Sequence, residues 1–132
     1  MVGTGGIRLA AAVAAAFGLV VTAQGTASAA PRTVDATFGG YGEWNADPYG
    51  GAPGDSIRAC DTSADGWSIE VKLDIGGDGT WDRIATTRGH TAPYCTSWKT
   101  GNIKEGTPVR VQVANVNGGA TYPKGSLLLS RA

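Results

Sequence analysis

Two cysteines and a histidine are the residues of this chain with the most definite chemistry. Cys60 and Cys95 are the only cysteines, 35 residues apart, and His90 is the only histidine. These three side chains cannot fill a tetrahedral zinc site without carboxylates, and no C-x-x-C spacing occurs. In an exported chain two such cysteines form a disulfide by default. We therefore predict one structural disulfide, for which the chain-entropy treatment gives a stabilisation of about 4 kcal/mol.

A run of aspartates and glycines matches part of a calcium-binding loop. Asp74, Asp78 and Asp82 take the first, fifth and ninth positions of the EF-hand spacing. However, Gly76 stands at the third position, and Ala85 stands where the bidentate glutamate belongs. The same residues alternate as strands, whereas an EF-hand loop needs flanking helices. We expect a hairpin turn without a metal ion or other cofactor, and a weak calcium site of another kind stays open as an alternative.

The chain carries no recognisable catalytic arrangement. His90 lies in a loop-like segment, 89–93, where a serine hydrolase would need it as general base, yet there is no G-x-S-x-G motif. Nearby Ser97 and Asp82 fit ordinary strand patterns. Glycoside hydrolysis needs paired carboxylates, and nothing pairs the three glutamates, Glu43, Glu70 and Glu105. We expect no catalytic residue and no enzymatic activity.

The stretch 39–54, GGYGEWNADPYGGAPG, is the best candidate for a binding site. It places Tyr41, Trp44 and Tyr49 among glycines and prolines. Aromatic rings on loops give binding proteins a large, rigid contact surface, or planes that stack on sugar rings. A small domain also needs its aromatic residues for burial. We therefore favour the alternative that Trp44 and one tyrosine close an open end of the core.

A second aromatic set is Tyr94, Thr96 and Trp98, which alternate along one expected strand face. This set could form a binding surface. Burial in the core is the more frequent fate of such residues in a small domain, and we favour it here.

Strands must position these residues, because the alternation of apolar and polar side chains is strong. It is clearest over 67–75, and the glycine-rich turn at 76–79 then leads into a returning strand over 80–87. Trp81 and Ile84 are three residues apart on that strand. Either one of them is exposed or a bulge lies between them.

Further strands are expected over 109–116, before the turn 117–119, and over 127–130. Weaker strand patterns cover 33–38, 56–60 and 94–99. The composition is rich in glycine, valine and threonine and poor in leucine, which favours strands over helices. About seven short strands predict an all-β fold, either a small antiparallel β-sandwich of immunoglobulin-like architecture or a partly open barrel.

The two cysteines lie on the more polar side of their expected strands. Cys60 alternates with Arg58, and Cys95 alternates with Ser97. Immunoglobulin domains join two sheets through the core and have a longer interval between the cysteines. We therefore expect the disulfide to be a staple near strand ends, and "immunoglobulin-like" describes the architecture only.

The first 29 residues have the pattern of a secretory signal peptide. Arg8 precedes an apolar run, 9–23, and small residues end in Ala27-Ser28-Ala29. The apolar run is too short and too rich in alanine for a membrane span. We expect residues 30–132 to form a single exported domain that is not anchored in a membrane.

The charge balance excludes whole classes of partner. After the leader, eleven acidic and ten basic residues remain, which gives a net charge near −1. A polybasic nucleic-acid binder is excluded, and there is no electrostatic reason for membrane attachment.

Three segments carry a resemblance to small, functionally uncharacterised secreted proteins of actinobacteria: DSIRACD at 55–61, ADG at 64–66 and GHTAPYC at 89–95. The leader, rich in alanine, glycine and valine, is similar to the export signals of these bacteria. The resemblance implies export and one disulfide, and it brings no activity. Secreted amylase inhibitors and chromoproteins have similar size and β content but carry two disulfides, so their binding residues are not transferred to this chain.

The sequence therefore predicts a secreted, monomeric, non-enzymatic β domain that binds a protein or a glycan outside the cell, with Tyr41, Trp44 and Tyr49 as candidate contact residues. A secreted inhibitor of a hydrolase is the main alternative, and a small extracellular hydrolase is the least favoured. An inhibitor should display a protruding, rigid loop, whereas a glycan binder should display two coplanar exposed rings.

Overall fold

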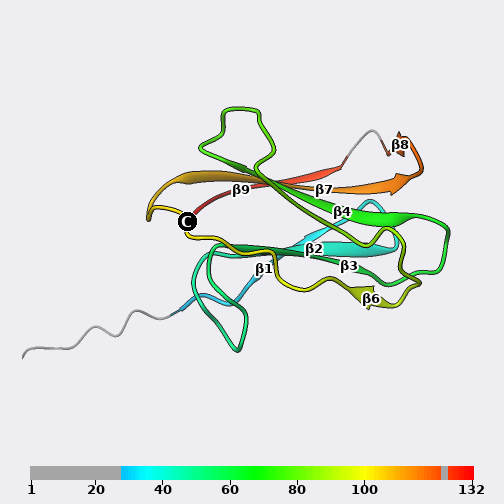
Figure 1. The fold of residues 1–132 in the computed structure, drawn as a ribbon, viewed down its shortest axis with the longest axis horizontal. Helices are drawn as coiled ribbons and strands as arrows, with labels where there is room; N and C mark the ends of the chain where they lie inside the picture. Colours follow the sequence, from blue (N-terminus) through cyan, green and yellow to red (C-terminus); the bar gives the residue numbers. More distant parts are fainter. Residues whose placement is uncertain (1–27, 123–124) are drawn as a thin grey trace, which may run out of the picture.

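The computed structural model describes residues 28–122 and 125–132. The expected leader over residues 1–29 lies outside these residues except for its last two positions. The described residues form nine strands in two antiparallel sheets, without any helix, and Figure 1 shows the sheets as stacked layers. The predicted all-β sandwich is confirmed, and the sheets do not close into a barrel.

The first sheet is four-stranded, and its strands follow the order β1 (Arg32–Asp35), β2 (Gly40–Asn45), β3 (Ser56–Asp61) and β6 (Tyr94–Cys95). The second sheet is five-stranded and is built on β5 (Arg83–Thr86), β4 (Ser68–Ile75) and β7 (Pro108–Asn117), with β8 (Ala120–Thr121) and β9 (Ser126–Arg131) pairing the two ends of β7. The described residues contain no helix that is long and apolar enough to cross a membrane.

The core lies between the sheets and is built on β4 and β7. These strands pair over their whole common length, so that alternate residues from Ile69 to Leu73 and from Val109 to Val113 face inward and are buried. Trp44 and Ile57 cover them from the first sheet. Burying an aliphatic side chain of this size contributes about 1.5–3 kcal/mol to the stability of the fold. The alternation of apolar and polar residues in these two segments therefore favours the strand conformation, which buries every apolar side chain on one face.

The structure corrects the expectation of a loop over 39–54, because its first part is strand β2. Glycine is uncommon in strands, so a segment rich in glycine does not show the sequence pattern of a strand. Here the glycines are required for packing. A Cβ atom on Gly42 would stand 2.6 Å from γ-methyl carbons of Val71 and Val113 on the facing sheet. Glycine at this position therefore lets the two sheets approach each other.

Two other strands are shorter than the sequence suggests. β5 begins at Arg83 rather than at residue 80, and Ile84 is 45% exposed on it. Of the two alternatives for Trp81 and Ile84, exposure is therefore the correct one. The expected strand over 94–99 is continuous only over β6, since a bulge interrupts it.

The disulfide joins neighbouring strands of one sheet. Cys60 and Cys95 are directly opposite each other in the β3–β6 pair, at the last or next-to-last residue of each strand. The predicted pairing and the predicted staple near strand ends are both confirmed. The bridge does not cross the core, in contrast to the immunoglobulin pattern.

Three aromatic rings pack together where the turn after β1 meets the second sheet. Phe38, Trp67 and Tyr122 meet edge to face, with centroid distances of 5.4, 5.7 and 6.4 Å. Buried Asn115 of β7 holds the turn beside them, because its Nδ2 donates to Phe38 O at 2.8 Å and its Oδ1 accepts the N–H of Thr37 at 3.1 Å. Phe38 and Trp67 are partly buried in this cluster, whereas Tyr122 remains exposed.

Candidate functional site

A groove on the outer face of the first sheet brings together the side chains best suited to bind a ligand. It has a volume of about 390 Å³ and lies between the β2–β3 loop and the segment that follows β6. Its functional side chains are Glu43 of β2, Tyr49 of the loop, Arg58 of β3 and Trp98. We call it the Tyr49–Trp98 groove.

Tyr49 is presented by a tight turn rather than by a flexible loop. Its N–H donates to Ala52 O at 3.0 Å, and the Ala52 N–H donates back at 2.8 Å. The two residues between them, Gly50 and Gly51, have φ angles of 51° and 86°, which is the signature of a type I′ hairpin turn. Tyr49 is 47% exposed at this turn, so its ring is available to a ligand without a large ordering cost.

The base of the β2–β3 loop is tied to the rest of the protein by Asp55. Its N–H donates to Ala46 O at 3.0 Å, and its Oδ2 accepts the N–H of Ile103 at 2.8 Å. The Arg83 guanidinium donates to the Asp55 carbonyl and, at 3.2 Å, to the carbonyl of Gly101. Burial lowers the pKa of Arg83, although Asp55 and Asp82 oppose this effect, and arginine stays protonated at neutral pH. The loop, which projects from its sheet in Figure 1, is therefore braced.

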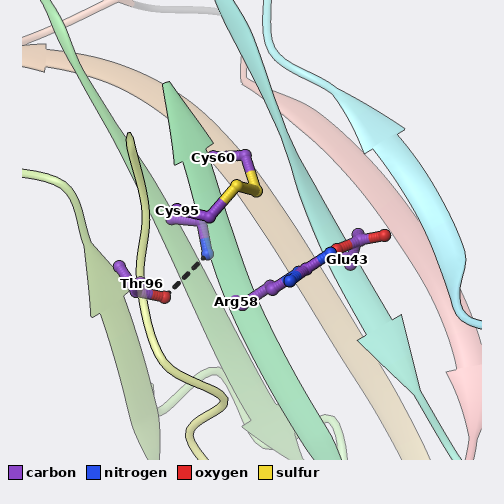
Figure 2. Close-up of a disulfide and its surroundings, with 6 residues drawn as sticks. Glu43, Arg58, Cys60, Cys95 and Thr96 are labelled. Carbon is purple, nitrogen blue, oxygen red and sulfur yellow. Dashed lines mark hydrogen bonds and ion pairs between the residues drawn. A yellow bond between two sulfur atoms is a disulfide. The ribbon is translucent and has the colours of Figure 1, made fainter. Parts of the chain in front are cut away.

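Arg58 and Glu43 supply the polar part of the groove. They are directly opposite each other in the β2–β3 pair, and the Arg58 Nε donates to Glu43 Oε2. Figure 2 shows the two side chains reaching toward each other on the strands beside the disulfide. The Arg58 Cζ also lies 4.7 Å from the ring centroid of Trp98, a cation–π contact. The guanidinium is thus fixed from two sides.

Trp98 reaches the groove because a β-bulge precedes it. Thr96 is opposite Ala59, because its N–H donates to Ala59 O at 2.8 Å and its Oγ1 accepts the Ala59 N–H at 3.1 Å. The dashed line in Figure 2 ends on the Thr96 hydroxyl. Lys99, in turn, is opposite Ile57. Three steps along this segment therefore match two steps along β3, which defines a bulge. The extra residue moves the Trp98 ring to the outer face, whereas Thr96 stays buried on the inner face.

The sequence-predicted binding residues separate in the structure. Tyr49 lines the groove, while Tyr41 lies half-buried on the same face of β2 as Glu43 and does not line it. Trp44 is 1% exposed and packs in the core, so it is not a candidate contact residue. The sequence-based alternative that Trp44 is buried in the core is therefore correct.

Of the functional side chains of the groove, Tyr49 was the leading candidate in the sequence, and Glu43 and Arg58 were not assigned to a binding site. Arg58 looked like an ordinary polar strand residue, and no local signal marks it as a ligand contact. Trp98 was noted, but on one face with Tyr94 and Thr96, which is wrong because of the bulge.

The groove combines two aromatic planes with a fixed donor and a fixed acceptor. Tyrosine and tryptophan rings stack on the apolar faces of sugar rings, and charged groups held in place can exchange hydrogen bonds with hydroxyl groups. The lining contains one carboxylate, Glu43, and that carboxylate is already paired with Arg58. The arrangement suits recognition of a neutral, hydroxyl-rich ligand.

The three aspartates of the β4–β5 turn come together as the calcium-loop spacing suggested. Carboxylate oxygens of Asp74, Asp78 and Asp82 lie within 4.8 Å of one another. Asp74 accepts two backbone N–H groups of the turn at 3.1 and 3.0 Å, and Asp82 accepts a third at 2.7 Å. Arg110 lies 3.6 Å from the buried Asp74 carboxylate. The carboxylates thus already have partners that shape the hairpin, and the absence of a metal site stays a prediction.

His90 lies at a separate, smaller pocket of about 280 Å³ beside the loop that follows β3. Its ring stacks on Tyr94 with a centroid distance of 3.8 Å and an interplanar angle of 5°. Within residues 28–122 and 125–132, no hydrogen bond joins its ring to a serine or a carboxylate side chain. The expectation that His90 has no catalytic role stays a prediction.

Comparison of the chain with protein-family models, with curated proteins and with solved structures returns no match. The geometry of the groove is therefore the basis for a function.

Proposed function

We propose that this protein is an exported, non-enzymatic binding domain that holds a neutral glycan in the Tyr49–Trp98 groove. The observation that carries the proposal is the convergence of Tyr49 and Trp98 with the Arg58–Glu43 pair in one concave surface. A disulfide is compatible with an extracellular location.

The rigidity of the groove favours binding over a purely structural role. Holding an arginine side chain in one rotamer costs conformational entropy, and Arg58 is held by both a carboxylate and an aromatic face. The Arg58 side chain is 31% exposed and the Glu43 side chain is 13% exposed, so the arginine end of the pair is the more open to solvent and to a ligand. Pre-ordered polar groups next to the exposed Tyr49 ring lower the entropic cost of holding a ligand.

The groove also favours binding over hydrolysis. Glycosidases place two carboxyl groups on opposite sides of the scissile bond. The described lining offers only Glu43, and that carboxylate already accepts a hydrogen bond from Arg58.

Titration with soluble hexasaccharides of glucose, xylose and N-acetylglucosamine tests the proposal. Binding should quench tryptophan fluorescence and shift the amide resonances of Tyr49, Arg58 and Trp98. Tyr49→Ala should weaken binding about tenfold, because it removes one stacking plane, whereas Tyr49→Phe should bind within about twofold of wild type.

Trp81→Ala provides the matched control, since Trp81 is a half-buried aromatic residue of the β4–β5 hairpin, on the other sheet. It should leave binding unchanged. If no sugar binds at millimolar concentration, or if Trp81→Ala weakens binding as much as Tyr49→Ala does, the groove is not a glycan site.

A second candidate function is inhibition of a secreted hydrolase, and the braced β2–β3 loop favours it. Inhibitors rely on a rigid, protruding loop, and the segment from Ala46 to Asp55 is fixed at both its tip and its base. The two functions differ in their readout. An inhibitor should slow an amylase or a protease at nanomolar to micromolar concentration and should show no response to the free hexasaccharides.

A further inference from the structure

Strand β9 ends the second sheet with one side unpaired. In the part of the chain that the structure describes, β9 pairs only with β7, and nothing is hydrogen-bonded to its other side. An edge of this kind exposes a row of backbone donors and acceptors that can pair with another polypeptide.

The register identifies the backbone groups that face outward. The Ala132 N–H donates to Thr107 O at 3.0 Å, continuing the β7–β9 pairing in which Pro108 is opposite Arg131. In an antiparallel pair the hydrogen-bonded residues alternate. Ser126, Leu128 and Ser130 therefore direct their backbone groups toward β7. The outward-facing N–H and C=O groups belong to Leu127, Leu129 and Arg131.

The same strand exposes apolar side chains on the outer face of the sheet. Leu127 is 49% exposed and Leu129 is 66% exposed, the highest values among the large apolar residues of the described chain. Their side chains alternate with those of Leu128 and Ser130, which point toward the core side. A strand added to this edge would extend the outer face and could pack its own side chains beside the two leucines.

Positive charge surrounds this edge. A groove of about 630 Å³ runs past β9 and is lined by Arg32 of β1, Arg110 of β7 and Arg131 of β9, together with Leu129. The described lining of the groove contains no carboxylate. Arg131 donates to Gly106 O at 2.8 Å, so its guanidinium is held in place. Arg110 lies 3.6 Å from the Asp74 carboxylate, so the excess positive charge of this groove comes from Arg32 and Arg131.

The geometry points to an extended acidic polypeptide segment as the occupant, added as a further strand along β9. Charge complementarity decides against a second copy of this chain, because a twofold pair across β9 would bring the arginine-lined grooves of both copies together. A small anion would use the guanidinium groups but not the backbone edge or the leucines. This surface is separate from the Tyr49–Trp98 groove, and the inference does not depend on glycan binding.

Amide hydrogen exchange with two short acetylated peptides tests the inference. One peptide alternates threonine and glutamate, and its matched partner alternates threonine and lysine. The glutamate peptide should slow exchange at Leu127, Leu129 and Arg131 at least about tenfold and leave Leu128 and Ser130 unchanged, because the latter already pair with β7. The lysine peptide should cause no protection.

Variants of β9 separate strand addition from simple charge attraction. Leu129→Pro removes an outward N–H without touching the pairing with β7, and edge strands tolerate proline. It should abolish protection by the glutamate peptide, whereas Leu129→Ala keeps the N–H and should retain it. Leu127→Pro gives the same test if Leu129→Pro does not fold.

Charge reversal gives an independent test. Arg131→Glu should weaken binding of the glutamate peptide at least about fivefold, and Arg88→Glu, at an exposed arginine outside the groove, should not. Equal binding of both peptides would overturn the inference. So would an undiminished response of Leu129→Pro, displacement of the glutamate peptide by inorganic phosphate at equal concentration, or protection of β9 that rises with protein concentration in the absence of peptide.

Discussion

Thr96 illustrates how one hydroxyl group can position a candidate ligand contact. Its Oγ1 accepts the Ala59 N–H at 3.1 Å in the place where a regular strand would offer a backbone carbonyl. The side chain therefore completes the β3 ladder at the point where the bulge begins. Two residues later Trp98 stands over Arg58, so the geometry of the groove depends on this buried hydrogen bond.

Thr96→Val should lower the free energy of unfolding by about 1–3 kcal/mol. Valine keeps the shape of threonine but leaves the buried Ala59 N–H without a partner. The Trp98 resonances should shift as well, because the bulge loses its fixed point. Thr96→Ser, which keeps the hydroxyl, is the control in denaturant unfolding. Equal stability of the valine and serine variants would contradict this role of the hydroxyl.

At the scale of elements, β2 and β4 show two ways in which strands are positioned. β4 is selected by its own alternation, whereas β2 depends on a close approach between sheets that only glycine permits. The hairpin after β4 adds a third device, since aspartate side chains bind the backbone of the turn.

Gly42→Ala should destabilise the protein by about 1–3 kcal/mol through overpacking. The added methyl would meet Val71 and Val113 at 2.6 Å, and neither branched side chain can move away within the packed core. Gly119→Ala is the matched control, because no atom lies within 4 Å of its added Cβ. Thermal unfolding measures both. A Gly42→Ala variant as stable as the control would show that the sheets are not in close contact here.

Calcium should leave the melting temperature unchanged. Asp74 and Asp82 already accept backbone N–H groups, and Arg110 partly neutralises the buried Asp74 carboxylate. A cation would have to displace these partners. Calorimetric scans with excess calcium and with a chelator should therefore superimpose. A rise of several degrees with calcium, abolished in Asp78→Asn, would establish a metal site at this turn.

At the scale of the whole molecule, the two sheets share one core, and the disulfide fixes one border of the first sheet. The core cluster includes residues of β1, β2, β3, β4, β5 and β7. β6 has two residues and, among the described strands, pairs with β3, so the Cys60–Cys95 bridge adds a covalent link to this short pairing. The segment that carries Trp98 follows directly after this attachment.

Removing the disulfide should therefore affect stability and the groove together. Cys60→Ala combined with Cys95→Ala should lower the free energy of unfolding by about 2–4 kcal/mol, because the unfolded chain regains loop entropy. For a domain of this size the melting temperature should fall by about 10–20 °C. Glycan binding should weaken at temperatures where the variant is still folded. Unchanged melting would mean that the bridge does not constrain the unfolded chain.

Local sequence alone determined the all-β class, the strands over 67–75 and 109–116 and the disulfide. Each of these depends on side-chain alternation within one segment or on the only two cysteines in the chain. Such features need no knowledge of what lies opposite, since the period of a strand is a property of its own backbone.

Only the tertiary structure decided that Trp44 is buried, that Trp98 turns outward and that Arg32 and Arg131, from opposite ends of the folded chain, line one groove. A bulge or a glycine contact between sheets depends on atoms far away in sequence, and both override the simple alternation of a strand. The candidate sites lie at these long-range contacts, because pairing between distant strands sets which side chains meet.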